Sequence, residues 1–99
     1  MKDIRQKYPD RVPVICNGTK NLKHKITNQK YLVPKETTLM EFLSKLRRTF
    51  KLDSTQGIYI AIDGDLPLLN STFAELDDLY RHEEDGILYM DILQENVFG

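Results

Sequence analysis

The sequence contains few side chains of the types that carry out metal or nucleophilic chemistry. It has one cysteine, Cys16, and two histidines, His24 and His82. A structural zinc site needs about four such ligands, so these residues are too few, and their spacing matches no zinc motif. Cys16 ends the apolar run at residues 12–16, and no histidine lies near it in the sequence. We therefore interpret Cys16 as a buried core residue rather than a catalytic thiol.

Other catalytic signatures are missing from the sequence. Neither the glycine-rich loop of dinucleotide-binding proteins nor the phosphate-binding GxxxxGK[ST] motif occurs. The serines have no nucleophile-elbow sequence around them. The acidic run Glu83-Glu84-Asp85 could bind a cation, but a solvated acidic loop is the simpler interpretation. We therefore expect a protein that is not an enzyme, needs no cofactor and holds no metal.

The last two residues, Phe98 and Gly99, are a different kind of chemical candidate. A terminal glycine is often only a frayed chain end. Its carboxylate, however, has no side chain beside it and can enter a narrow enzyme channel in conformations that other residues cannot adopt. At this point the residues alone leave both interpretations open.

Charge is divided unevenly along the 99-residue chain. Residues 1–51 hold 13 Lys/Arg and 4 Asp/Glu, whereas residues 52–99 hold 1 and 11. A basic half favours an acidic partner, although two oppositely charged halves of one domain can also attract each other. The length suits a single domain. Because the polar start lacks the apolar segment of a signal peptide, we expect a cytoplasmic protein.

The first third of the chain predicts a short helix and two strands. Ile4 and Tyr8 lie four residues apart and share one helix face, and Pro9 ends that helix nearby. The β-branched apolar run at residues 12–16 predicts a strand, and residues 31–33 predict a second one.

Turn-forming residues follow both strands. Asn17-Gly18 is a turn signal after the first strand. Pro34 follows the second strand directly, and because proline cannot donate to a strand ladder, we expect an edge strand there. Adjacent strands this early in the chain imply a hairpin.

Two later helices begin with the same capping signal. Thr38 and Glu41 form the T-x-x-E pattern of a capping box, as do Thr72 and Glu75. The apolar residues that follow each pattern have helical spacing and predict one buried stripe per helix. They are Leu39, Phe42, Leu43, Leu46 and Phe50 in the first helix and Phe73, Leu76, Leu79 and Tyr80 in the second.

Two apolar runs predict further strands. Residues 58–62 and 87–93 are almost continuously apolar, so we expect both strands to be central in the sheet. The resulting order is helix, strand, strand, helix, strand, short helix, strand. It predicts an α+β domain in which a mixed four-stranded sheet packs on one main helix. This is the ubiquitin-like β-grasp arrangement, with a short N-terminal helix added.

Four segments carry a family resemblance. They are RVPVIC at residues 11–16, KYLVP at residues 30–34, DGILY at residues 85–89 and ENVFG at residues 95–99. In this order they resemble the autophagy-related ubiquitin-like modifiers that are conjugated to phosphatidylethanolamine, the GABARAP-like family. The resemblance runs from Ile4 to Gly99 without large gaps. Further matches are Phe42 and residues 46–48, 66–67 and 79–80.

The resemblance implies a conjugation cycle that acts on Gly99. An activating enzyme adenylates this glycine and takes it as a thioester, and a conjugating enzyme passes it to the amine of phosphatidylethanolamine. The protein would be cytoplasmic when free and bound to an autophagosome or other vesicle membrane when lipidated. The implied partners include a deconjugating cysteine protease. Residues 1–95 would form the ubiquitin-like domain and residues 96–99 a flexible conjugation tail, either encoded to end at Gly99 or processed to it.

The resemblance also implies a binding site for short Trp/Phe/Tyr-x-x-Leu/Ile/Val motifs of cargo receptors and autophagy proteins. Such a peptide adds a strand beside residues 31–33 and places its two anchor side chains in two pockets. The residues implied for the aromatic pocket are Ile4, Pro13, Ile15, Lys30, Leu32 and Ile87. Those implied for the aliphatic pocket are Tyr31, Val33, Pro34, Phe42 and Leu46. Arg11 and Arg48, together with Lys30, would form a basic rim that attracts acidic residues flanking the motif.

The sequence departs from the family pattern in three respects. The family usually begins with an additional helix, and Met1 would lie inside the second one, which removes an acidic residue from the rim of the aromatic pocket. Thr37 and Lys45 stand where the family usually has apolar residues at the aliphatic pocket. Thr49 replaces a usual arginine. We therefore expect an altered peptide preference.

Two alternative functions remain open from the sequence. A related autophagy modifier, which also ends on glycine, is joined to a lysine of another protein. An unconjugated β-grasp interaction domain, or a nucleic-acid binder that uses the basic half, would have an inert tail. We prefer the lipid-conjugated modifier because KYLVP and the final FG occur together, and we expect no nucleic-acid partner.

Overall fold

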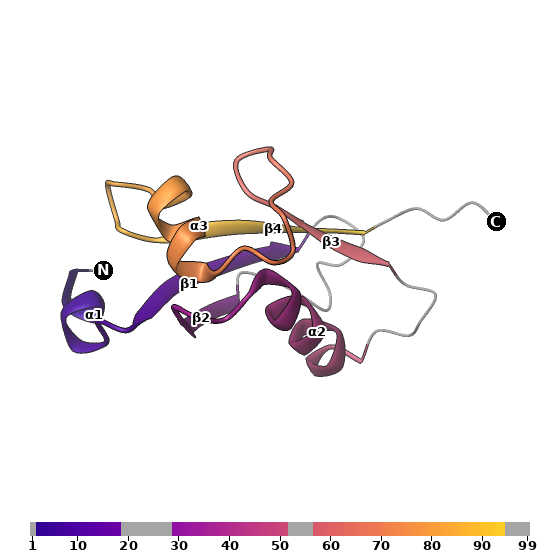
Figure 1. Cartoon of the computed structure of the whole chain (residues 1–99), viewed down its shortest axis with the longest axis horizontal. Helices are drawn as coiled ribbons and strands as arrows, with labels where there is room; N and C mark the ends of the chain where they lie inside the picture. Colours follow the sequence, from indigo (N-terminus) through magenta and orange to yellow (C-terminus); the bar gives the residue numbers. More distant parts are fainter. Residues whose placement is uncertain (1, 19–28, 52–56, 95–99) are drawn as a thin grey trace.

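The computed structural model describes residues 2–18, 29–51 and 57–94 of the chain (Figure 1). The elements follow the order predicted from the sequence. They are α1 (Lys2–Lys7), β1 (Arg11–Gly18), β2 (Gln29–Pro34), α2 (Leu39–Thr49), β3 (Ile58–Ala61), α3 (Phe73–Tyr80) and β4 (Leu88–Gln94).

The described strands form one mixed sheet in the order β2-β1-β4-β3. β1 and β2 are an antiparallel hairpin pair, β1 and β4 run parallel, and β4 and β3 are antiparallel. The last strand of the chain is therefore inserted between earlier ones, as its apolar sequence predicts. This topology confirms the predicted mixed sheet and the predicted edge position of β2.

Two strand predictions were wrong. The strand at residues 58–61 is not central but forms the other edge of the sheet. Its first three side chains alternate: Ile58 and Ile60 are buried, whereas Tyr59 is 39% exposed. The apolar run also extends beyond the strand to Ile62, which is fully buried at the tight turn that follows β3.

The second error concerns the end of β1. Asn17 and Gly18 do not form a turn there but continue the strand, opposite Asp91 and Ile92 of β4. A turn signal is local, whereas pairing with β4 keeps both residues in the extended backbone conformation of the strand. This parallel partner lies more than 70 residues away in the sequence.

One face of the sheet and two helices enclose the core. β1 and β4 contribute alternate residues to it, and α2 and α3 contribute their apolar stripes. The loop before α3 runs alongside the start of α2, because Leu39 N donates to Ser71 O and Met40 N donates to Leu69 O. α1 lies near the start of β1 (Figure 1), and its Arg5 side chain is ion-paired with Asp77 of α3. The central core residues are Val12, Val14, Cys16, Leu39, Phe42, Leu46, Phe73, Leu76, Leu88, Met90 and Ile92.

Both predicted capping boxes are formed. At the start of α2, Glu41 N donates to Thr38 Oγ1 at 3.2 Å, and Thr38 N donates to Glu41 Oε1 at 3.0 Å. Thr72 and Glu75 make the same reciprocal pair at the start of α3. Each box satisfies two backbone donors that an isolated helix would leave without a partner.

Replacing Thr38 with alanine is expected to lower the free energy of unfolding by about 1 kcal/mol, because the backbone donor of Glu41 then loses its acceptor. Urea unfolding followed by circular dichroism measures this loss. Thr38→Ser keeps the hydroxyl and should retain most of the stability. Equal losses in both variants would contradict a capping role for the hydroxyl.

Candidate functional site

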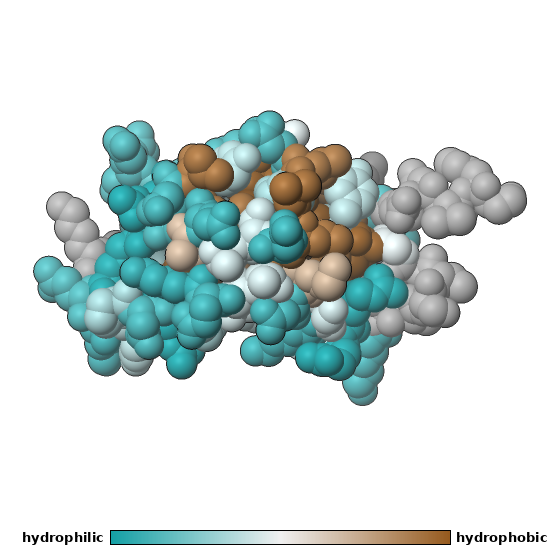
Figure 2. All heavy atoms as spheres, in the orientation of Figure 1, coloured by the Kyte–Doolittle hydropathy of each residue, from teal (hydrophilic) through white to brown (hydrophobic). Residues whose placement is uncertain are grey.

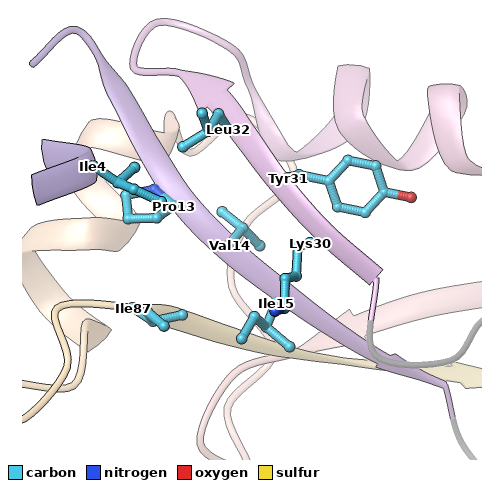
Figure 3. Close-up of a pocket in the computed structure, with 8 residues that line it drawn as sticks. All are labelled: Ile4, Pro13, Val14, Ile15, Lys30, Tyr31, Leu32 and Ile87. Atoms are coloured by element: carbon cyan, nitrogen blue, oxygen red, sulfur yellow. The ribbon is translucent and has the colours of Figure 1, made fainter. Parts of the chain in front are cut away.

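A cavity of about 360 Å³ lies on the face of the sheet opposite the main core. It contains all the residues that the sequence analysis assigned to the aromatic pocket, and Figure 3 shows them around β1 and β2. Val14 and Tyr31 also contribute to its wall. The Tyr31 ring points away from the other side chains, toward the far side of β2 (Figure 3). The lining residues are Ile4, Pro13, Val14, Ile15, Lys30, Tyr31, Leu32 and Ile87.

Strand alternation explains how this cavity forms. Val12, Val14 and Cys16 of β1 are buried in the core, so the residues between them, Pro13 and Ile15, face the opposite side. In the hairpin register, Pro13 pairs with Leu32 and Ile15 pairs with Lys30, which brings these four side chains to one face. Ile4 from α1 and Ile87 from just before β4 complete the lining.

A second hollow of about 320 Å³ lies between β2 and α2. We call it the β2–α2 groove. Its apolar part consists of Tyr31, Val33, Pro34 and Phe42, which the sequence analysis assigned to the aliphatic pocket. The full lining is Tyr31, Leu32, Val33, Pro34, Thr37, Glu41, Phe42, Lys45 and Arg48.

Leu46, also assigned to that pocket, does not line the β2–α2 groove. It is 1% exposed and belongs to the core. Helical spacing identifies the apolar stripe of α2 but does not distinguish its inner members from those that reach the groove. Thr37 and Lys45, the two departures from the family pattern, do line the groove, and so does Glu41, which the sequence analysis missed.

The strand between these two hollows has a free edge. In the described sheet β2 pairs only with β1, so its other edge carries no strand. Arg11, predicted for the rim, is exposed, and its Nη1 donates to the carbonyl oxygen of Leu32 at 3.4 Å. Arg48, also predicted for the rim, lines the β2–α2 groove. The two hollows and the open edge together form a site suited to an extended peptide.

A partly buried ion pair holds α1 next to this site. Arg5 Nη2 donates to Asp77 Oδ1 at 2.7 Å and Arg5 Nη1 donates to Asp77 Oδ2 at 3.1 Å. Arg5 Nε and Nη2 also donate to the carbonyl oxygen of Gly86 at 3.0 and 2.7 Å. Asp77 is only 3% exposed. We call this arrangement the Arg5 clamp. Arg5 directly follows the cavity residue Ile4, and Gly86 directly precedes the cavity residue Ile87. The clamp therefore ties together the two segments that carry these cavity residues.

The Arg5 clamp was not predicted from the sequence. The one available signal was an acidic residue, Asp77, beside Leu76 on the apolar side of α3. Nothing in the sequence linked it to an arginine 72 residues earlier. Gly86 suits the clamp for two reasons, because its φ is +71° and an added Cβ would lie 3.2 Å from Arg5 Nε.

Three comparisons with known proteins identify the family. The family model described as "Autophagy protein Atg8 ubiquitin like" matches residues 1–99. The chain belongs to the Atg8 family. Among curated Atg8-family proteins, it is 41% identical to Autophagy-related protein 8 of Schizosaccharomyces pombe, over 97% of this chain and 79% of that protein. It is 40% identical to Autophagy-related protein 8 of Mycosarcoma maydis, over 97% of this chain and 81% of that protein.

A solved Atg8 structure supports the same assignment. The crystal structure of Trypanosoma brucei ATG8 superposes with a TM-score of 0.81 at 30% sequence identity. The match covers 99% of this chain and 84% of the trypanosome chain. Family membership therefore confirms the resemblance found in the sequence and the ubiquitin-like β-grasp fold. The protein is an Atg8-type ubiquitin-like modifier of the autophagy system.

The structure places Cys16, the single cysteine of this Atg8-family chain, in the hydrophobic core. Cys16 is fully buried, and this burial raises the pKa of its thiol to about 12. A thiol with that pKa is protonated at neutral pH and is a poor nucleophile, which agrees with the interpretation as a core residue. Within the described ranges, no group of three His, Cys, Asp or Glu residues is placed to hold a metal ion.

The acidic loop after α3 has a local structural role. Asp85 Oδ1 accepts a hydrogen bond from Ile87 N at 3.0 Å, and Asp85 Oδ2 accepts one from Tyr89 Oη at 2.5 Å. The bond from Tyr89 is the larger cause of the lowered pKa of Asp85. His82 follows α3 and stacks on Tyr89, with ring centroids 4.6 Å apart. These contacts fix the loop that leads into the cavity residue Ile87.

Apolar side chains also gather on the side of the sheet away from β2. Tyr59, Ile60, Leu66, Pro67 and Leu69 line a hollow of about 510 Å³. Figure 2 shows apolar surface over the segment between β3 and α3, with hydrophilic residues around it. This patch was not predicted. It is separate from both hollows beside β2, because β2 and β3 are opposite edges of the sheet.

Some predicted features lie outside the described residues. They are the lysine-rich stretch at residues 20–25 with His24, and the tail at residues 95–99 with Gly99. None of the described helices combines the length and the apolar character needed to cross a membrane.

Proposed function

We propose that this Atg8-family protein is joined through Gly99 to phosphatidylethanolamine and binds Trp/Phe/Tyr-x-x-Leu/Ile/Val motifs beside β2. The observation that carries the binding half is the pair of hollows on the two sides of one free edge strand. The conjugation half rests on family membership and on the ENVFG ending.

Motif binding has a direct physical basis at this site. A peptide strand can pair with the open edge of β2 through backbone hydrogen bonds, while alternate side chains enter the hollows. Burying one large apolar anchor in the cavity lined by Ile4, Pro13 and Leu32 contributes roughly 1.5–3 kcal/mol. After the cost of ordering the peptide, two anchors give reversible binding suited to the capture of cargo receptors.

Conjugation would change where the protein resides. Gly99 has no Cβ, so its carboxylate can enter the narrow sites of an activating and a conjugating enzyme. A lipid with two acyl chains holds a protein at a bilayer far more firmly than one acyl chain does. The conjugated protein would present β2 at an autophagosome or vesicle membrane until a cysteine protease releases it. The chain itself would catalyse no step.

Leu32→Arg tests the binding half. Fluorescence anisotropy with a labelled Trp-x-x-Leu peptide should show at least about a tenfold loss of affinity, because arginine places a charge in an apolar cavity. The matched control is Tyr59→Arg, which alters the half-exposed side chain on the opposite edge strand. Equal affinities for the wild-type protein and Leu32→Arg would overturn binding beside β2.

Gly99→Ala tests the conjugation half. The protein is combined with the Atg8 activating and conjugating enzymes of its native cells, ATP and vesicles that contain phosphatidylethanolamine, and products are identified by mass spectrometry. We expect a lipid adduct that Gly99→Ala abolishes. An adduct to a protein lysine would instead support the protein-conjugated alternative. Absence of any Gly99-dependent adduct would support an unconjugated interaction domain.

A further inference from the structure

The β2–α2 groove has two cationic side chains on its α2 wall. Lys45 and Arg48 are three residues apart on the helix, so they lie on the same helical face. Both are exposed, and both line the groove. Within residues 2–18, 29–51 and 57–94, neither takes part in an ion pair.

The acidic residue closest to them along α2 is already engaged. Glu41 lies four residues before Lys45, the spacing at which a helical ion pair forms. Its Oε1, however, accepts hydrogen bonds from Thr38 N and Thr38 Oγ1, both at 3.0 Å. These bonds lower the pKa of Glu41, with the backbone bond as the larger cause. The capping box thus holds the carboxylate at the start of the helix.

Apart from Thr37 and Glu41, the remaining residues that line the groove are mainly apolar. Val33, Pro34 and the Phe42 ring form its floor, and Phe42 meets the Tyr31 ring edge-on at a centroid distance of 5.3 Å. The cavity on the other side of β2 has one cationic lining residue, Lys30. The two hollows beside β2 are therefore chemically different. The first is mainly apolar. The second combines apolar residues with the two cations, with Thr37 and with Glu41, whose carboxylate is held by the capping box.

We propose that the β2–α2 groove of this chain selects an acidic anchor, so that aromatic-x-x-Glu segments are ligands. This proposal rests on the proposed function, because it assumes that an extended peptide lies beside β2. The methylene groups of a glutamate can pack on Pro34 and Phe42. Its carboxylate can then accept charge-assisted hydrogen bonds from Lys45 and Arg48. A leucine would fill the floor but would leave both cations without a partner.

The test compares three peptides that differ only at the fourth position, which is Leu, Glu or Gln. Glutamine has the shape of glutamate without its charge, so the ratio of the two affinities isolates the electrostatic contribution. We expect the Glu peptide to bind about three- to tenfold more tightly than the Gln peptide at low ionic strength, because both charge pairs are partly solvated. Added salt should reduce that ratio.

Variants assign the effect to the groove. In Lys45→Met/Arg48→Met the ratio of the Glu and Gln affinities should fall to about 1, and the Leu peptide should bind at least as well as before. Lys35→Met is the control, because Lys35 is exposed and follows β2 directly but does not line the groove. This control should keep the preference for Glu.

The outcomes separate this proposal from the proposed function. If the Leu peptide binds and the Glu and Gln peptides bind equally, the acidic-anchor proposal is overturned while motif binding stands. A Glu preference that survives in Lys45→Met/Arg48→Met, or that Lys35→Met also abolishes, overturns the assignment to this groove. If none of the three peptides binds, the proposed function and this proposal both fail.

Discussion

Arg5→Met is expected to lower the free energy of unfolding by about 2–3 kcal/mol, through the loss of the Arg5 clamp. Methionine keeps much of the side-chain length but removes the charge and all donors. Asp77, which is 3% exposed, would be left as a buried carboxylate. Its remaining ion-pair partner would be Arg81, at the longer distance of 3.4 Å. The figure is below that for a fully buried pair because the Arg5 side chain is 25% exposed.

Urea unfolding of Arg5→Met and Arg81→Met measures this effect with a matched control. Arg81 contacts the same carboxylate, but its side chain is 46% exposed and makes no bond to Gly86. We expect Arg81→Met to cost less than about 1 kcal/mol. Amide hydrogen exchange should be faster in Arg5→Met at Tyr8, whose N–H donates to Ile4 O. Equal stability losses in the two variants would contradict the clamp.

Phe73→Ala is expected to destabilise the protein by about 3–5 kcal/mol, because the Phe73 ring is fully buried and its removal leaves a cavity. Since a domain of this size has a net stability of roughly 5–15 kcal/mol, the variant should be close to unfolding at 37 °C. The ring also supports the candidate site. Phe73 contacts Phe42 at a centroid distance of 5.1 Å, and Phe42 lines the β2–α2 groove.

Thermal unfolding compares Phe73→Ala with Leu79→Ala on the same helix. Leu79 is 73% exposed, so its truncation should change stability by no more than about 0.5 kcal/mol. Phe73→Leu retains most of the volume and should stay folded, which allows peptide affinity to be measured with a perturbed Phe42. If Phe73→Ala and Leu79→Ala melt at the same temperature, the core described around Phe73 is wrong.

The elements themselves were predictable because their signals are local. A capping box needs only Thr38 and Glu41, three residues apart, and an amphipathic helix needs only its own spacing. The edge position of β2 followed from Pro34, since proline lacks a backbone donor. The residues around the first cavity were named from the family resemblance, and the hairpin register brings Pro13 opposite Leu32 and Ile15 opposite Lys30.

What the sequence determined by itself was thus the order of the elements, their caps and the family. The tertiary structure decided the features that depend on distant partners. It placed residues 58–61 at a sheet edge and extended β1 through Gly18, because both depend on where β4 lies. It assigned Leu46 to the core and brought Arg5 to Asp77. Such pairings depend on which surfaces meet after folding, and neither residue spacing nor local propensity contains that information.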